Sequence, residues 1–447
     1  MNMNKNNEDK ISTVSEINKI NISNKDSHSI NVDHKNCSYC NEPFIERLWC
    51  KECDPRRIIE GWTSGNHDID KFIKDTIYNS RKFYFGSFIE WVPFDRLKNV
   101  KQIGGEFSKI YSATWIDGQA TYNKQGDGSW KKLDPKPIEV ALKRLNGAET
   151  ITNESLNEIK IHWDLYSKSN TFLEFYGITK DPETKEFMMI IQFANQGNLR
   201  YILSSNFNNI LWKEKINYLY GIIIDLKNLH ELEYCHKNVH SGNILQDDED
   251  SYISNLESAG PSNKQRTDNK IFGVLPYIAP EVLYGEPYTL SSDIYSFGVI
   301  MAEISSEKPP FYERKHDTNL ASEICNGVRP EFGNGTPEIY KKLAYRCMNA
   351  DSNQRPTANE LHELLYFWRE SISFFGRRYL QEDRLGYEGK EIQSIFKKAN
   401  NVEVDNTSYE IDADAIYTSR IFTFSNLPKP VNSSIIITYL NNDENKD

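Results

Sequence analysis

The sequence has no apolar stretch that approaches the roughly 18 residues needed for a bilayer-spanning helix, so we expect no membrane span. It also has too little positive charge to offset its acidic residues, and its net charge at pH 7 is −11. This balance disfavours binding to nucleic acid or to an anionic membrane. The first residues lack the apolar core of a secretory signal peptide, so we expect an intracellular, cytoplasmic protein, with a nuclear location left open.

Cysteine is sparse, and four of the seven cysteines form two close pairs. Two C-x-x-C pairs without a signal peptide indicate metal ligands in a reducing compartment rather than disulfides. Four thiolates can close a tetrahedral structural Zn²⁺ site, and the short gap between the pairs favours a small zinc knuckle or ribbon. Four reduced cysteines in a loop are the alternative. The expected ligands are Cys37, Cys40, Cys50 and Cys53.

The length of 447 residues suggests two or three structural units. Residues 1–36 are polar and rich in asparagine, and we expect a disordered tail because they cannot bury enough apolar surface. Residues 37–53 hold the predicted zinc knuckle. Residues 54–93 are expected to form a helical connector, since apolar side chains recur at helical spacing over residues 68–80.

The most informative stretch is residues 236–245, His-Lys-Asn-Val-His-Ser-Gly-Asn-Ile-Leu. It resembles the catalytic loop of eukaryotic protein kinases, H-R-D-L-x-x-x-N, in which the Asp accepts the proton of the substrate hydroxyl and the Asn helps to hold Mg²⁺. The resemblance places Asn243 at the metal-binding amide and Asn238 at the catalytic base. An amide cannot act as a base at physiological pH.

A second amide stands where the family has the Mg²⁺-binding Asp of its D-F-G motif. The segment Asn255-Leu256-Glu257 follows a short strand at the expected distance from the loop. Mg²⁺ prefers anionic oxygen ligands, so this neutral side chain is a poorer ligand. Three aspartates precede that strand, and we interpret them as a solvated turn rather than as replacement metal ligands: Asp247, Asp248 and Asp250.

The apolar strand that ends at Lys143 resembles the V-A-I-K motif, whose Lys pairs with ATP phosphates and with a Glu of the next helix. By order and spacing that partner is Glu158, with Glu154 as the competing candidate one turn earlier. The resemblance therefore predicts an ion pair between Lys143 and Glu158.

The other expected nucleotide contacts come from a glycine-rich loop and from a hinge. By the resemblance the hinge is residues 192–194, whose backbone groups would contact adenine. The loop, residues 103–111, is a degraded version of G-x-G-x-x-G-x-V. A serine replaces its third glycine, and a Cβ there restricts the approach of the backbone to phosphate. The cofactor-binding set implied by the resemblance is Gly104, Gly105, Ser108, Ala141, Lys143, Ile191, Gln192, Ala194, Asn243 and Asn255.

The best-preserved motifs lie later in the chain. Residues 276–281 match the A-P-E end of an activation segment, residues 292–299 resemble the central helix whose Asp braces the catalytic loop, and Arg355 matches the partner of the A-P-E Glu, here Glu281. These motifs imply an α+β, two-lobed protein kinase fold over residues 94–370. We expect a small β-rich lobe with one main helix, followed by a larger helical lobe.

Residues 371–447 show no motif, and we expect a partly disordered C-terminal tail, with a docking tail as the alternative. The combined features predict a pseudokinase, a kinase-fold protein with impaired catalysis, that binds ATP weakly and regulates other signalling proteins. Two alternatives remain: an active ATP-dependent kinase with atypical catalytic residues, and a scaffold that binds no nucleotide.

Overall fold

In the computed structural model the chain divides into two units, residues 1–54 and 55–447. Every described residue belongs to the second unit. The predicted disordered tail and zinc knuckle lie outside the described residues. The structure describes residues 63–441 except 80–87, 106–108, 120–121, 125–129, 133–135, 146–150, 170, 249, 263–269, 374–382, 385 and 403–408.

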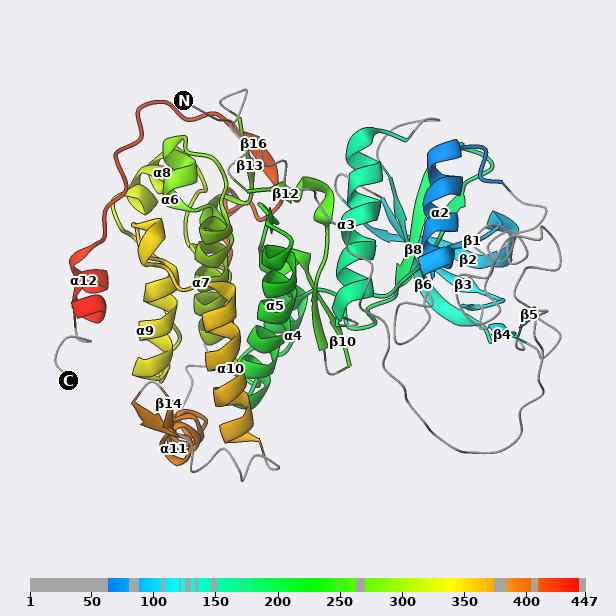
Figure 1. Cartoon of the computed structure of the whole chain (residues 1–447). Coiled ribbons are helices and arrows are strands. Elements are labelled where there is room, and N and C mark those ends of the chain that lie inside the picture. Colours follow the sequence, from blue (N-terminus) through cyan, green and yellow to red (C-terminus); the bar gives the residue numbers. More distant parts are fainter. Residues whose placement is uncertain are drawn as a thin grey trace, which may run out of the picture. The chain divides into compact units, whose positions relative to one another are not determined.

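A six-stranded sheet with the order β1-β7-β8-β6-β3-β2 forms the smaller lobe (Figure 1). Neighbouring strands are antiparallel, except that β1 pairs in parallel with β7. The strands are β1 (Glu90–Trp91), β2 (Leu97–Gly104), β3 (Ile110–Trp115), β6 (Ile138–Arg144), β7 (Phe175–Lys180) and β8 (Phe187–Gln192).

Apolar side chains of β8 alternate between the two faces of this sheet, as the two-residue period of a strand requires. Phe187, Met189 and Ile191 pack in one hydrophobic cluster, whereas Met188 and Ile190 pack in the cluster on the opposite face. A nearly continuous apolar sequence therefore produces a strand that is buried on both sides.

Two helices contribute to the first of these clusters, α2 (His67–Asn79) and α3 (Asn153–Ser169). The spacing of apolar residues predicts a helix over residues 68–80, and α2 begins one residue earlier. Ile69, Ile73 and Ile77 of α2 are fully buried. Residues that precede position 94 thus supply both α2 and β1 to the smaller lobe.

A buried histidine makes the smaller lobe sensitive to acid. The Nε2 of His162 on α3 lies 3.0 Å from the carbonyl oxygen of Leu173 and donates a hydrogen bond to it. Burial lowers the pKa of His162 to about 4, although the carbonyl hydrogen bond opposes this shift and the charge of Lys143 adds to it. The ring is therefore neutral at pH 7.

Replacing this histidine is expected to flatten the pH dependence of folding. The unfolded chain binds a proton at His162 near pH 6.5 and the folded chain only near pH 4, so stability falls as the pH drops through this window. The difference between the two pKa values corresponds to about 3 kcal/mol of stability. Urea unfolding at pH 7 and pH 4 measures the loss of stability on acidification. This loss should be smaller in His162→Phe than in wild type by about 3 kcal/mol. An equal loss in both proteins would contradict the assignment.

The larger lobe is a helical assembly organised around α7 (Leu290–Ser306), which is buried along almost its entire length (Figure 1). A Cβ at Gly298 would approach Met348 and Cys347, so glycine at this position allows close helix packing. The other helices are α4 (Leu199–Ser205), α5 (Trp212–Glu231), α6 (Pro280–Tyr284), α8 (Thr318–Cys325), α9 (Glu338–Cys347), α10 (Ala358–Ile372), α11 (Gly389–Ala399) and α12 (Ser434–Asn441).

Five two-stranded pairings lie outside the six-stranded sheet among the described residues. One of them joins distant parts of the chain, since β13 lies after the catalytic loop and β16 lies near the C-terminus. The pairs are β4 (Tyr122–Lys124) with β5 (Trp130–Lys132), β9 (Tyr234–Cys235) with β12 (Gly260–Pro261), β10 (Ile244–Asp247) with β11 (Asp250–Ile253), β13 (Ile271–Gly273) with β16 (Arg420–Phe422), and β14 (Asp383–Arg384) with β15 (Tyr387–Glu388).

Candidate functional site

The predicted ion pair of the smaller lobe is present. Strand β6 lies between β3 and β8, which fixes Lys143 near the end of the strand. Its Nζ donates to Oε1 of Glu158 on α3. Both side chains are less than one-tenth exposed. Glu154, the competing candidate, lies in the first turn of α3 and is exposed.

The amide at the D-F-G position contacts the same lysine. Asn255 has φ 65° and ψ 63°, a left-handed conformation that asparagine tolerates better than most residues. Its Oδ1 accepts a hydrogen bond of 3.1 Å from Lys143 Nζ. The lysine therefore joins α3 to the segment after β11, and the three side chains form one polar cluster.

The catalytic loop is held from behind by the central helix, as its motif predicts. Asp293 of α7 accepts hydrogen bonds from the backbone N–H groups of His236 at 2.7 Å and Lys237 at 2.9 Å. His236 Nε2 lies 3.0 Å from the carbonyl oxygen of Ser254 and donates to it. Burial lowers the pKa of His236, so its neutral ring links the loop to the residue before Asn255.

Hydrogen bonds also hold Asn238 and Asn243, the two asparagines of the catalytic loop. Asn243 Nδ2 donates to the carbonyl oxygen of Asn238 at 2.9 Å. The side chain of Asn238 turns the other way and contacts Ser419 of the C-terminal region, with Nδ2 and Oδ1 at 2.9 and 3.2 Å from the serine Oγ. Asn238 is 4% exposed. The base position is thus covered by the chain itself.

A second neutral side chain faces the same serine. His240 Nε2 lies 3.4 Å from Ser419 Oγ. Burial, reinforced by the positive charge of Arg200, lowers the pKa of His240 well below its ordinary value. A ring with such a low pKa is a weak base. The hydroxyl of Ser419 therefore meets two side chains that are both poor proton acceptors.

A buried polar network supports the loop from beneath, and motif reasoning did not find it. The two carboxylate oxygens of Glu303 accept hydrogen bonds of 2.7 Å from Ser241 Oγ and from the Tyr277 hydroxyl. Arg200 Nε lies 3.2 Å from Ser241 Oγ. Burial raises the pKa of Glu303. The only signal in the sequence was the presence of charged residues inside otherwise apolar helices.

Two of the expected nucleotide-binding positions face each other in the sheet. Ala141 on β6 is in register with Ile191 on β8, and both are 7% exposed. The next residue, Gln192, uses its backbone N–H to bond the carbonyl oxygen of Glu174. Its side chain donates to Asp247 at 2.6 Å.

The other expected ligand-binding residues lie at or near strand ends or outside the described residues. Gly104 ends β2, and Gly105 has φ 100°, a conformation that L side chains rarely adopt. Ala194 is half-buried after β8. Ser108 lies outside the described residues. The cysteines expected to bind zinc also lie outside them, and the described part of the chain holds no cluster of three or more potential metal-ligating residues.

The three aspartates near the catalytic loop belong to a hairpin. Asp247 ends β10 and Asp250 begins β11, and Asp248 lies in the turn between them. Asp248 accepts a hydrogen bond of 3.2 Å from Asn195. Asp247 contacts Gln192 at the end of β8, and Asp248 contacts Asn195 just after it. Asp248 lies in the turn itself, and Asp247 and Asp250 are the strand residues that flank it.

Comparison with known proteins assigns the family. The family of protein tyrosine and serine/threonine kinases matches residues 97–365. Because this match covers more than half of the chain, the protein belongs to the protein kinase family, and its sheet-rich and helical lobes are those of the kinase fold. Members of this family use ATP and Mg²⁺ in general.

The similar proteins are kinases of considerably greater length. A probable serine/threonine-protein kinase of Dictyostelium discoideum is 26% identical over 290 residues, which cover 61% of this chain and 15% of that protein. Stress-activated protein kinase alpha of the same organism is 26% identical over 243 residues, which cover 50% of this chain and 37% of that protein. The chain thus spans well under half of either relative. No helix among residues that the structure describes is long and apolar enough to cross a bilayer.

Proposed function

We propose that this protein is a pseudokinase that binds ATP weakly and regulates other signalling proteins. The observation that carries the proposal is the placement of two neutral amides at the two carboxylate positions of the site. Asn255 lies against Lys143, and Asn238 lies in the catalytic loop beneath Ser419. Loss of a general base alone typically slows a reaction by about 10²- to 10⁴-fold.

The residues present fit a nucleotide better than they fit its metal ion. Lys143 supplies a buried cation that is already oriented by Glu158, and the paired Ala141 and Ile191 offer an apolar contact for a base. Asn243 and Asn255 would be the ligands on the metal side, and neither carries a negative charge. Bound ATP would supply the phosphoryl group, while these side chains would only bind and orient it.

Nucleotide should therefore stabilise the protein with little dependence on Mg²⁺. At ATP concentrations about ten times Kd, the stabilisation of about 1.4 kcal/mol should raise Tm by about 2 °C. Differential scanning fluorimetry with and without Mg²⁺ measures the shift, and Lys143→Met, compared with its own nucleotide-free form, should lose most of it. A shift that requires Mg²⁺ would contradict the proposed role of the amides.

A scaffold that binds no nucleotide is the second candidate. The observation that favours it is that Lys143 is already engaged by Glu158 and Asn255. Its signature would be the absence of any Tm shift with ATP, whether or not Mg²⁺ is present. The structural zinc site at Cys37, Cys40, Cys50 and Cys53 stays a prediction under either function.

A further inference from the structure

The C-terminal region passes directly in front of the catalytic loop. Strand β16 pairs antiparallel with β13, with Gly273 opposite Arg420, Phe272 opposite Ile421 and Ile271 opposite Phe422 (Figure 1). Strand β13 follows the catalytic loop in the chain and precedes the A-P-E motif. A strand edge at this point can recognise an extended polypeptide through main-chain hydrogen bonds.

The residue before β16 brings a hydroxyl to the base position. Ser419 is 8% exposed, and its Oγ lies within hydrogen-bond distance of both polar atoms of Asn238. In the family the group at this position contacts the hydroxyl that receives the phosphoryl group. Ser419 thus stands where an acceptor residue would stand, at a site that has lost its base.

Tyr417, two residues before Ser419, is held through both its side chain and its backbone. The hydroxyl of Tyr417 donates to the carbonyl oxygen of Pro310 at 3.0 Å, and its ring packs edge-on against His316. Arg200 donates to the carbonyl oxygen of Tyr417 at 3.0 Å, and its guanidinium lies 5.0 Å from the centre of the tyrosine ring. Because Arg200 also contacts Ser241, this anchor reaches the network beneath the catalytic loop.

The residues after Ser419 are also anchored to the larger lobe or to one another, with one exception. Arg420 donates to the carbonyl oxygen of His316 at 2.6 Å, and its guanidinium lies over the ring of Phe422. The rings of Phe422 and Phe424 stack with centres 5.4 Å apart. Ile421 is 62% exposed, so it faces solvent between anchored neighbours.

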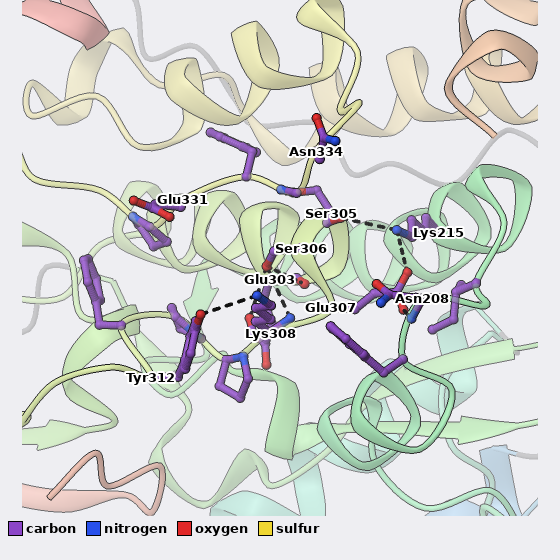
Figure 2. A pocket seen from close by; sticks show the side chains of 18 of the residues that line it. Asn208, Lys215, Glu303, Ser305, Ser306, Glu307, Lys308, Tyr312, Glu331 and Asn334 are labelled. Carbon is purple, nitrogen blue, oxygen red and sulfur yellow. Dashed lines mark hydrogen bonds and ion pairs between the residues drawn. The ribbon is translucent and has the colours of Figure 1, made fainter. Parts of the chain in front are cut away.

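The segment is also held before it reaches the loop. The ring of Tyr409 packs against Phe207 and Tyr312, and the ammonium of Lys308 lies within 6 Å of all three ring centres. Figure 2 shows Lys308 and Tyr312 directed toward one another. Both residues line a cavity of about 460 Å³ in the larger lobe. Asp412 N–H then donates to the carbonyl oxygen of Tyr312 at 2.9 Å.

Further contacts hold the segment after it leaves the loop. Val431 N–H donates to the carbonyl oxygen of Cys325 at 2.9 Å. Asn432 accepts from Ala350 N–H and donates to Asn349 Oδ1, both at 2.8 Å. A Cβ at Gly327 would collide with the backbone of Ser433, so the chain passes closely over a glycine there. The segment is therefore tethered on both sides of Ser419.

We propose that residues 416–424 are a built-in pseudosubstrate: they fill the groove that receives an extended polypeptide, with Ser419 in the place of the acceptor residue. This proposal rests on the proposed function, because it takes Asn238 as the residue that replaces the catalytic base. A partner segment with the same chemistry enters only after this segment is displaced. That chemistry is an aromatic residue, then a hydroxyl two residues later, a cation directly after it, and a second aromatic residue two positions further on.

The tether makes the internal segment a strong competitor. A covalently linked segment competes at an effective concentration on the order of millimolar. A free peptide of the same sequence should therefore bind wild type weakly and should bind a variant with a displaced segment at least about tenfold more tightly.

Peptide binding to the full chain tests the proposal. The probe is a fluorescein-labelled peptide with the sequence of residues 414–426, and anisotropy is measured without nucleotide, so that the outcome is independent of ATP binding. In Ser419→Arg a long cation replaces a buried hydroxyl and should eject the segment. The matched control Ile421→Arg places the same side chain at an exposed position of the same strand and should bind the peptide as wild type does. A probe with Arg at the serine position should bind neither variant.

Hydrogen exchange of β13 reports ejection independently of peptide binding. Amides of residues 271–273 should exchange faster in Ser419→Arg than in wild type or Ile421→Arg. A second variant, Tyr417→Ala with Phe422→Ala, removes anchors without adding bulk and should behave like Ser419→Arg. Faster exchange without tighter peptide binding would overturn the proposal. Unchanged exchange in both displaced variants would overturn it as well.

Discussion

Replacing both amides by carboxylates, in Asn238→Asp with Asn255→Asp, is expected to raise autophosphorylation by at least about 10²- to 10⁴-fold. The first substitution restores a proton acceptor at the loop, and the second restores an anionic ligand for Mg²⁺. Asp tolerates the left-handed backbone of position 255 nearly as well as Asn does. Transfer of labelled phosphate from ATP with Mg²⁺ measures the gain.

The structure also indicates where the first phosphate should appear. Ser419 Oγ already lies 3.2 Å from Asn238 Oδ1, so the fold itself holds this hydroxyl at the loop and no encounter with a separate acceptor is needed. Phosphopeptide mapping of the double variant should find Ser419 modified. Adding Lys143→Met to the double variant should abolish the signal. A double variant that binds ATP but incorporates no labelled phosphate would contradict the claim that the two amides block phosphoryl transfer.

Truncating Arg355 is expected to be among the most destabilising changes in the larger lobe, at about 3–5 kcal/mol. Its guanidinium donates to both oxygens of Glu281 at 2.7 and 2.6 Å, and it also reaches the carbonyl oxygens of Asn349 and Ser291. The side chains of Arg355 and Glu281 are 0% and 7% exposed. Arg355→Ala would leave the carboxylate of Glu281 buried without its partner.

Urea unfolding with a matched surface pair measures this cost. Arg314 forms a similar two-bond pair with Glu323, but both side chains are more than one-third exposed. Arg314→Ala should therefore cost less than about 1 kcal/mol. Removing both buried charges, in Glu281→Gln with Arg355→Met, should recover part of the loss. Equal effects of Arg355→Ala and Arg314→Ala would show that burial of the pair does not determine its contribution.

Local motifs predicted the parts of the site that depend on short-range spacing. Lys143 and Glu158 are 15 positions apart. Lys143 lies near the end of β6 and Glu158 in the second turn of α3, so one connection sets their separation. Asn238 and Asn243 belong to one loop, and Asn255 follows a hairpin that begins directly after it. The ion pair of Arg355 with Glu281 spans 74 positions, but each residue lies in a recognisable motif.

The contacts of the C-terminal region could not be predicted in the same way. Asn238 and Ser419 are 181 positions apart, and a pairing of three residues carries no sequence signature beyond a few apolar side chains. Residues 371–447 were expected to be a partly disordered extension because they show no motif, with a docking tail as the alternative. Their described part packs against the larger lobe through single hydrogen bonds and ring contacts. Such contacts depend on the folded surface and not on local periodicity.

The buried network of Arg200, Ser241, Tyr277 and Glu303 was missed for a related reason. Each of its residues lies in a different segment, and polar side chains in apolar helices do not indicate which partners they will meet. Helix α2 was predicted correctly as a helix, but its burial against the sheet depends on tertiary packing that helical spacing does not specify.

Phosphate incorporation by the wild-type chain is the most direct test of the central claim, that the amides at 238 and 255 silence phosphoryl transfer. The purified chain is incubated with labelled ATP and either Mg²⁺ or Mn²⁺, next to Lys143→Met as the blank. The account predicts that wild type incorporates no more label than Lys143→Met with either metal ion. Incorporation by wild type that Lys143→Met abolishes would contradict it and would make the protein an active kinase with substitute catalytic residues.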